Sequence, residues 1–438
     1  MRRSLLLVFL LVLLSLGAAS CSLFGHEKTP PALPVTQHTA TMDLTPGIIV
    51  NGLVETPRGF TPIVGQPPLW LQGNKEVALT GTLQGRTEVL GFSGPAYKGM
   101  RLVAADGGPG APHGKIVGLA ASPDGLTLAV AEAEPGRIEI VVRYVISNGG
   151  QNSVASFDGN FHAVSLTWLA PNTLAVGLAG ESAAPPAQPG GLYLIHVLGA
   201  VTVEEVKLDC PPSMLVFSPD ARFAVGEGDE QTPASVFDSR NGNCHQVSLD
   251  GPIRVLGWAP GSSAFLYSTA AGRGHGGGVF RYNIVDGKTD LIAVSSSAAA
   301  YTGEGVVMAL GNRELTQQTA AALPDKRVTA QIASFVPRKG QTIVDNLGIP
   351  TTPAMMMAST MTYSHGFAEL ALQLYADAAA GPTREIVTFS IVDRKAFVLA
   401  SGGVSGVAVI GWAPGANQLV IFDGDGATGA LAVITPSR

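Results

Sequence analysis

The chain is poor in charged residues. Asp, Glu, Lys and Arg make up 14% of its 438 residues, and the formal net charge at pH 7 is −6. Lys and Arg form no cluster along the sequence. A protein that binds nucleic acid needs a basic stripe to replace the counterions of the phosphates. The composition therefore argues against nucleic acid as a partner.

Motifs for catalysis, cofactors and metals are also missing. The sequence holds no G-x-S-x-G elbow, no C-x-x-C-H haem site and no H-E-x-x-H zinc site, and its eight histidines are scattered. We therefore expect no catalytic residue, no cofactor and no bound metal. A weak exception is Asp423-Gly424-Asp425-Gly426, which could offer two carboxylates to Ca²⁺ but has the composition of an ordinary turn.

Long apolar runs are scarce outside the N-terminus. The stretch from Leu5 to Leu16 follows Arg2-Arg3 and is too short to span a bilayer, which is typical of a secretory signal. It leads into Ala18-Ala19-Ser20-Cys21, which resembles a bacterial lipobox. The resemblance implies cleavage before Cys21, diacylglycerol on its sulfur and a membrane-anchored lipoprotein, facing the periplasm from an outer membrane or lying on the cell surface. An ordinary signal with an incidental cysteine is the alternative.

These features divide the chain into three parts. We expect a signal peptide over residues 1–20, a lipidated Cys21 with a flexible tether over residues 21–46, and one domain over residues 47–438. Four prolines among Thr and Gln make the tether segment unsuitable for a packed core. Acyl chains contribute about 0.8 kcal/mol per buried methylene, so several of them anchor a protein firmly.

The most informative feature of the sequence is a repeated unit that contains a tight turn. All four tryptophans stand between an apolar run and a tight turn, and similar places recur at intervals of 41 to 62 residues. The eight repeat positions are Trp70, Ala121, Trp168, Phe217, Trp258, Tyr301, Tyr363 and Trp412. This spacing suits four short strands and three turns per unit, which is the blade of a β-propeller. We expect an all-β fold of eight four-stranded blades, with seven as the alternative, and tryptophan rings packed between neighbouring blades.

The turn motif points to a group of propellers. Ala121-Ser122-Pro123-Asp124-Gly125 and Phe217-Ser218-Pro219-Asp220-Ala221 resemble the F-S-P-D-G motif of TolB-like and WD-type propellers. The resemblance covers roughly residues 47 to 435. It implies a blade architecture and a role in binding or assembly, but the Gly-His and Trp-Asp pairs of strict WD repeats are absent.

The last repeat supplies only three strands, so the ring needs a strand from elsewhere. Residues 47–54 are strand-like and precede the first repeat. We expect this N-terminal segment to complete the last blade and close the ring.

Cys210 and Cys244 are the only thiols besides Cys21. Export would place them where disulfides persist. The expected register puts them at opposite ends of one blade, whereas a disulfide needs Cα atoms within about 7 Å. Both a disulfide and two separate thiols remain open, and the register favours the thiols.

The longest and most varied segments fall between the second and third strands of their units. They include a Gly-rich segment with Arg273 and His275, and an acidic segment, most simply solvated, that begins at Glu227 and contains Asp229 and Glu230. Such loops lie on one face of a propeller, and loops on a rigid scaffold often carry function. We expect a binding module for another envelope protein, a peptide or a glycan. The alternative is a hydrolase, lyase or lactonase with a site at the central channel.

Overall fold

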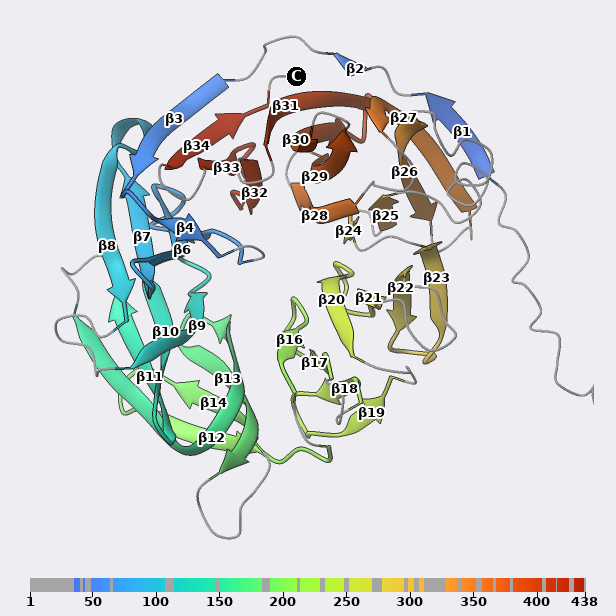
Figure 1. Cartoon of the computed structure of the whole chain (residues 1–438). Helices are drawn as coiled ribbons and strands as arrows, with labels where there is room; N and C mark the ends of the chain where they lie inside the picture. The colour runs from blue at the N-terminus through green and yellow to red at the C-terminus, as the bar shows by residue number, and fades with distance from the viewer. Residues whose placement is uncertain are drawn as a thin grey trace, which may run out of the picture.

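The computed structural model shows strands arranged in sheets around a central axis (Figure 1). It describes residues 35–39, 42–43 and 49–436, with gaps at 64–65, 107–113, 146–149, 183–189, 211–212, 229–232, 248–251, 270–277, 295–297, 303–306, 311–327, 337–340, 352–356, 365–367, 379–380, 404–406, 415 and 425–428. Among these residues no helix is long and apolar enough to span a membrane. The all-β fold class predicted from the repeat is confirmed.

The sheets follow one another along the chain, and we call each unit by its innermost strand. The β5 blade contains β5 (Leu69–Leu71), β6 (Glu76–Leu83), β7 (Arg86–Ser93) and β8 (Gly99–Ala105), with β4 (Thr61–Pro62) also paired to β6 and the 3-10 helix η2 (Pro95–Tyr97) before β8. The next sheet contains β9 (Lys115–Ala121), β10 (Thr127–Glu134), β11 (Arg137–Tyr144), β12 (Gln151–Ala170), β13 (Thr173–Ser182), β14 (Leu192–His196) and β15 (Thr202–Val206).

The remaining sheets repeat the four-strand pattern. Two of them are β16 (Leu215–Phe217), β17 (Phe223–Gly226), β18 (Ser235–Asp238) and β19 (Cys244–Gln246), then β20 (Ile253–Trp258), β21 (Ala264–Thr269), β22 (Gly278–Asn283) and β23 (Thr289–Val294). The last three groups are β24 (Ala299–Tyr301), β25 (Val307–Leu310), β26 (Val328–Val336) and β27 (Gln341–Thr351); β28 (Met357–Ser364), β29 (Glu369–Ala378), β30 (Gly381–Ser390) and β31 (Lys395–Gly403); and β32 (Val407–Trp412), β33 (Leu419–Gly424) and β34 (Gly429–Thr435).

Strand β12 belongs to two units at once. Its first part, residues 151–158, pairs with β11, and its second part, residues 159–170, pairs with β13. The 20-residue strand is therefore the outermost strand of the β9 blade and the innermost strand of a β12 blade. This explains why seven strands form one continuous sheet where the repeat predicts two blades of four.

The N-terminal segment pairs with the end of the chain. Strand β3 (Ile49–Thr56) is antiparallel to β34, from Ile49 opposite Thr435 to Thr56 opposite Gly429. It thus adds a fourth strand to β32, β33 and β34. An eight-blade ring closed by an N-terminal strand requires this pairing. The number of blades stays a prediction.

Two shorter strands lie within the segment expected to be the tether. Strand β1 (Val35–Thr39) pairs in parallel with β27, and β2 (Met42–Asp43) pairs in parallel with β31. Both lie outside the outermost strand of their blade (Figure 1). The extent of the flexible tether stays a prediction for the rest of residues 21–46.

Tryptophans pack between neighbouring blades, as the repeat predicts. Trp168 donates from Nε1 to the Ala120 carbonyl of β9 at 3.0 Å, and Trp412 donates to the Thr362 carbonyl of β28 at 3.3 Å. Each indole thereby bonds to the innermost strand of the preceding blade. The other two rings make apolar contacts across blades, Trp70 in a cluster with Ala413, Val420 and Phe422, and Trp258 in a cluster with Val225 and Val236.

Where the structure describes them, the first turns of several neighbouring blades contact one another. Gln72 N donates to the Gly125 carbonyl at 3.0 Å, and Asn74 Nδ2 donates to the Pro414 carbonyl at 2.6 Å. Gly125 has φ +67°, and a Cβ there would crowd the backbone at Trp70 and Gln72, so only glycine fits.

Within a blade, the first turn joins the innermost strand to the second, and the third turn joins the third strand to the outermost. Backbone hydrogen bonds connect the third turn to the first in five blades. Val145 N donates to Leu126 O, Val197 N to Asn172 O, Ser239 N to Arg222 O, Ile284 N to Ser263 O and Ile391 N to Ala368 O, at 2.9 to 3.0 Å. First and third turns therefore lie on one face of the ring, which we call the turn face. The second turns and the connections between blades, at the opposite ends of the strands, form the loop face.

Candidate functional site

Most of the predicted site residues lie in segments outside the described residues. These are Cys21, Asp229, Glu230, Arg273, His275 and Asp425. Asp423 lies on β33, but its side chain is also outside the described set. Among the described residues, no group of three or more His, Cys, Asp or Glu side chains is placed to hold a metal ion. The predicted binding residues therefore remain predictions.

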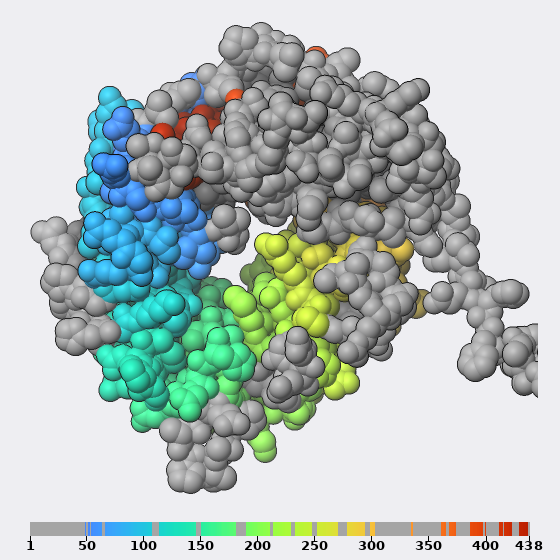
Figure 2. Space-filling model, in the orientation of Figure 1, coloured from blue at the N-terminus to red at the C-terminus, as the bar shows by residue number. Residues whose placement is uncertain are grey.

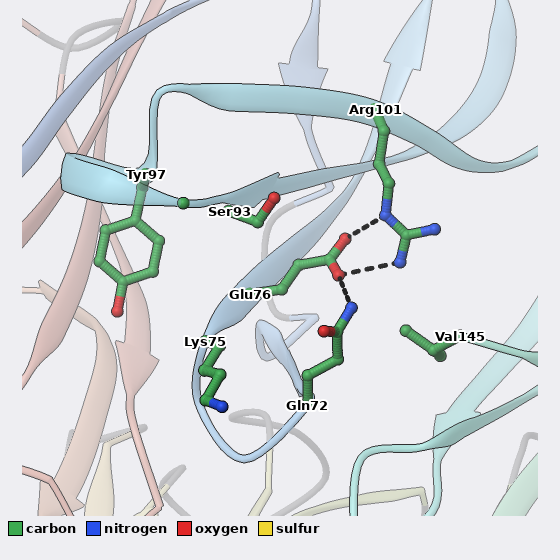
Figure 3. Close-up of a pocket in the computed structure, with 8 residues that line it drawn as sticks. Gln72, Lys75, Glu76, Ser93, Tyr97, Arg101 and Val145 are labelled. Atoms are coloured by element: carbon green, nitrogen blue, oxygen red, sulfur yellow. Dashed lines mark hydrogen bonds and ion pairs between the residues drawn. The ribbon is translucent and has the colours of Figure 1, made fainter. Parts of the chain in front are cut away.

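A polar hollow opens on the turn face of the β5 blade. It encloses about 670 Å³ and is lined by Gln72, Lys75, Glu76, Ser93, Gly94, Tyr97, Arg101 and Val145. The turn between β5 and β6 supplies its Gln and Lys, and β8 supplies its Arg (Figure 3). Strand β11 ends next to the hollow, so the neighbouring blade contributes one wall.

A buried ion pair forms the floor of this hollow. Arg101 Nε lies 2.7 Å from Glu76 Oε1 and Arg101 Nη2 lies 2.8 Å from Glu76 Oε2, while Gln72 Nε2 donates to Oε2 at 3.0 Å. The Glu76 side chain is 1% exposed and that of Arg101 is 38% exposed. Two parallel bonds fix the plane of the guanidinium. Its outer side, with the exposed Lys75 nearby, remains available to an anionic group (Figure 3).

Gly91 makes this ion pair possible. Gly91 lies on β7, between the strands that carry the two partners, and a Cβ there would collide with Glu76 Oε1 and Val103. This pair could not be predicted from the sequence, because its members are 25 residues apart and meet only across β7. The available signal was a glycine within an apolar strand, which often marks a close approach.

A second arginine–carboxylate pair lies inside the adjacent blade. Arg143 Nη2 on β11 is 3.3 Å from Glu132 Oε1 on β10, and Arg143 Nη1 donates to the Val103 carbonyl at 3.3 Å. Burial raises the pKa of Glu132, while the charge of Arg143 acts in the opposite direction. Both side chains are largely enclosed, at 1% and 17% exposure, so this pair ties two blades together rather than facing a ligand.

Glu227 is not the solvated residue that the sequence analysis expected. Glu227 Oε1 accepts a 2.6 Å hydrogen bond from Val255 N, which lies next to a bulge in β20. The side chain is half-buried, and burial raises its pKa. Glu227 thus stands on the loop face against β20, the innermost strand of the next blade, whose edge directs the N–H groups of Ile253 and Val255 toward it.

The cysteines lie closer than the expected register allowed. The Cα atoms of Cys210 and Cys244 are 6.1 Å apart, and the two sulfurs are in bonding contact. The placement at opposite ends of one blade was wrong because the chain after β15 first follows the edge of the next blade, where Asp209 N donates to Gly242 O at 3.0 Å. A Cβ at Gly242 would collide with the Lys207 carbonyl, so the two segments touch. The geometry supports a disulfide between consecutive blades.

The centre of the ring is hollow in space-filling view, bordered by described segments around β9, β16 and β20 (Figure 2). The innermost strands, including residues 163–170 of β12, carry two charged side chains, Lys115 and Arg254. The described walls of the channel are therefore mainly apolar or small.

Comparison with solved structures supports the fold. Sqt1 from Chaetomium thermophilum matches with 13% identity and a TM-score of 0.51, over 89% of this chain and 100% of that chain. Its complex with the N-terminus of the ribosomal protein L10 matches over 92% and 100% of the chains, with 13% identity and a TM-score of 0.49. TolB from Acinetobacter baumannii matches over 84% of this chain and 68% of that chain, with 12% identity and a TM-score of 0.36.

No protein-family model and no curated protein matches the chain. At 13% identity, the likeness to Sqt1 concerns the fold alone. Together with the sheet order and the ring of contacts between turns, it identifies the chain as a β-propeller. The fold implied by the resemblance to TolB-like and WD-type propellers is confirmed.

Proposed function

We propose that the protein is a lipid-anchored, extracytoplasmic β-propeller that acts as a non-enzymatic binding or assembly module in the bacterial cell envelope. One observation carries the proposal: the chain enters the ring on the turn face. Ile49 pairs with Thr435, and Asn417 Nδ2, in the first turn of the β32 blade, donates to the Pro436 carbonyl at 3.5 Å. Before Ile49, β2 and β1 follow the outer edges of two other blades, and Val35 pairs with Thr342 near the start of β27, which also lies on the turn face. A tether leading from Val35 back to Cys21 thus departs from the turn face and leaves the loop face free.

The anchor is the N-terminal lipobox-like segment that ends at Cys21. Several acyl chains on one cysteine suffice to hold a domain whose described residues include no helix able to span a membrane. Changing Cys21 to Ala should move the protein from the membrane fraction to the soluble fraction. Retention of the variant on membranes after a salt wash would contradict the lipid anchor.

The proposed partner is another envelope protein, a peptide or a glycan, and the proposed contact is the loop face. The segments between second and third strands contain Asp229, Glu230, Arg273 and His275, which offer both signs of charge. A rigid ring can display such segments without loss of stability. Nucleic acid, which would require a basic surface, is not a proposed partner.

A photo-crosslinking experiment tests which face binds. A photoreactive residue at position 273 should crosslink to a partner in intact envelopes, whereas the same residue at Asn241, exposed on the turn face, should not. Mass spectrometry of the adduct identifies the partner class. Crosslinks to a protein or glycan from position 241 alone would place the binding surface on the wrong face and contradict the proposal.

An enzyme with a site at the central channel is the second candidate, and Glu227 is the observation in its favour. A half-buried carboxyl with a raised pKa is suited to general acid or base catalysis. Arg254 is the one neighbouring charge that lowers this pKa, and the other innermost strands add few titratable groups. Glu227→Gln separates the candidates, because it should leave partner crosslinking intact, whereas an enzyme using this carboxyl would lose its activity.

A further inference from the structure

Three apolar side chains project from the turn face with almost no cover. Leu198 is 77% exposed, Val285 is 84% exposed and Val392 is 76% exposed. Each stands in the third turn of its blade, after β14, β22 and β30 respectively. Side chains of this size and exposure contribute little to the folded ring, so packing does not explain them.

The three residues hold the same position in their blades. Each directly follows a residue whose backbone N–H donates a hydrogen bond to the first turn of the same blade. These donors are Val197, Ile284 and Ile391 respectively. That bond fixes the turn and directs the next side chain outward. The exposed aliphatic residues are therefore fixed tips, repeated around the ring.

Other exposed apolar residues gather at the same face. Ile49, Leu126 and Tyr144 lie at strand ends or turns on the turn face. Met100, Leu102, Val201 and Val203 lie on or beside the outermost strands β8 and β15, at the outer rim of the ring. Among the described residues, Val117 and Met214 lie near the opposite ends of innermost strands. The exposed apolar surface is thus unevenly divided between the two faces.

Cations accompany these apolar tips. The described turns of the turn face carry Lys75, Lys98, Arg222, Arg240, Lys288 and Arg394, against Asp124, Asp220, Asp286 and Asp393. All four acids accept local hydrogen bonds, and Asp286 also lies 4.0 Å from Lys288 Nζ. The six cations thus exceed the four acids by two. The hollow of the β5 blade adds Lys75 and the outer side of Arg101, with Glu76 and Gln72 between them (Figure 3).

We propose that the turn face lies on a bilayer that contains anionic lipids. Leu198, Val285 and Val392 insert shallowly among the headgroups, and the hollow at Lys75 and Arg101 receives an anionic headgroup. Apolar tips combined with surface cations are the two contributions that hold interfacial proteins on membranes. The inference rests on the proposed function, because the lipid anchor brings this face to the membrane and the tether leaves from it.

Vesicle sedimentation tests the inference without any acyl chain. The processed chain from Ser22 onward retains every described strand and lacks both the signal segment and the lipidated cysteine. It should bind vesicles of phosphatidylglycerol and phosphatidylethanolamine reversibly, and vesicles of phosphatidylcholine more weakly. Changing Leu198, Val285 and Val392 together to Ser should weaken this binding about tenfold or more.

The matched control removes apolar surface from the other face. Val117→Ser with Met214→Ser should leave vesicle binding unchanged, and Lys75→Gln should weaken it about fivefold on anionic vesicles alone. Thermal unfolding of each variant confirms that it is folded. No vesicle binding by the unchanged chain, or equal losses in the tip variant and the control, would overturn the inference.

A protein partner on the turn face would give a different result. In that case the tip variant would lose a protein crosslink while binding vesicles like the unchanged chain, and the inference would be wrong. Failure here does not affect the lipid anchor, because the release of Cys21→Ala from membranes is measured separately.

Discussion

The two faces of this propeller are built differently. On the turn face, short turns bond to one another within and between blades, as Gln72 does to Gly125 and Ile284 does to Ser263. On the loop face, the connections vary from the two-residue turn between β6 and β7 to the long segment between β25 and β26. This difference indicates that the turn face supports the ring, whereas the loop face can change in sequence and length without unfolding the ring. Stability and binding should therefore respond to different substitutions.

Removal of β3 should have the largest effect on stability. A chain that begins at Pro57 loses the ladder of seven residue pairs with β34 and leaves an open sheet edge. We expect aggregation or a loss of more than about 5 kcal/mol, beyond the range of point substitutions. The control chain begins at Leu44, keeps β3 and should melt close to the parent. Equal melting of the two chains would mean that β3 does not close the ring.

Trp168→Ala should have the next largest effect. Trp168 is 8% exposed and loses both its apolar contacts across blades and its hydrogen bond to Ala120. Truncation of a large buried aromatic residue costs about 3 to 5 kcal/mol. Trp258→Ala should cost less, because Trp258 is only half-buried. Chemical denaturation measures both.

A loop-face control sharpens this result. Arg273→Ala with His275→Ala should change stability by about 0.5 kcal/mol or less, as is usual for surface positions. A Trp168→Ala protein that unfolds like this control would contradict the packing of tryptophans between blades.

The disulfide should contribute an intermediate amount. Cys244→Ser opens a link across 34 residues between consecutive blades, and such links typically stabilise by about 2 to 4 kcal/mol. The reduced parent should match the variant in a melting experiment. If reduction leaves the melting temperature of the parent unchanged, the two cysteines are separate thiols.

Asp124→Asn should have the smallest effect, and one that depends on pH. The hydrogen bond from Ser122 Oγ and that from Leu126 N hold the pKa of Asp124 below its ordinary 3.8. A lowered pKa stabilises the folded state above the unfolded value, and this stabilisation disappears as the pH falls through the folded value. The variant should melt slightly below the parent at pH 7, and the difference should shrink below pH 3.8 and vanish once the pH is below the pKa of folded Asp124. A difference that persists in acid would mean that the charge of Asp124 has no role.

The sequence predicts the repeating parts of the molecule better than its particular contacts. Tryptophans before tight turns and the Ser-Pro-Asp motif predict blades, because each reports a local hairpin that recurs. The continuous strand β12 was not predicted, since Asp158-Gly159-Asn160 in its middle has the composition of a turn, and yet the strand continues through it and serves two blades. Glu76 and Arg101 were missed because their contact depends on the register of three strands.

The cysteines and Glu227 show the same limit. The distance between Cys210 and Cys244 depends on the path of a connection around the outer edge, which no local pattern encodes. The burial of Glu227 depends on the edge of the innermost strand in the next blade, 28 residues away. The predicted loop residues Asp229, Glu230, Arg273 and His275 lie outside the described residues and remain predictions.

The central claim is that the turn face is directed toward the membrane and the loop face away from it. The most direct measurement is energy transfer from a fluorophore on the lipidated protein to acceptors at the surface of vesicles. Fluorophores attached at Val285→Cys on the turn face and at Gln84→Cys, in the turn between β6 and β7 on the loop face, provide the comparison. The account predicts strong transfer from position 285 and weak transfer from position 84. Equal transfer from both positions, or stronger transfer from position 84, would contradict it.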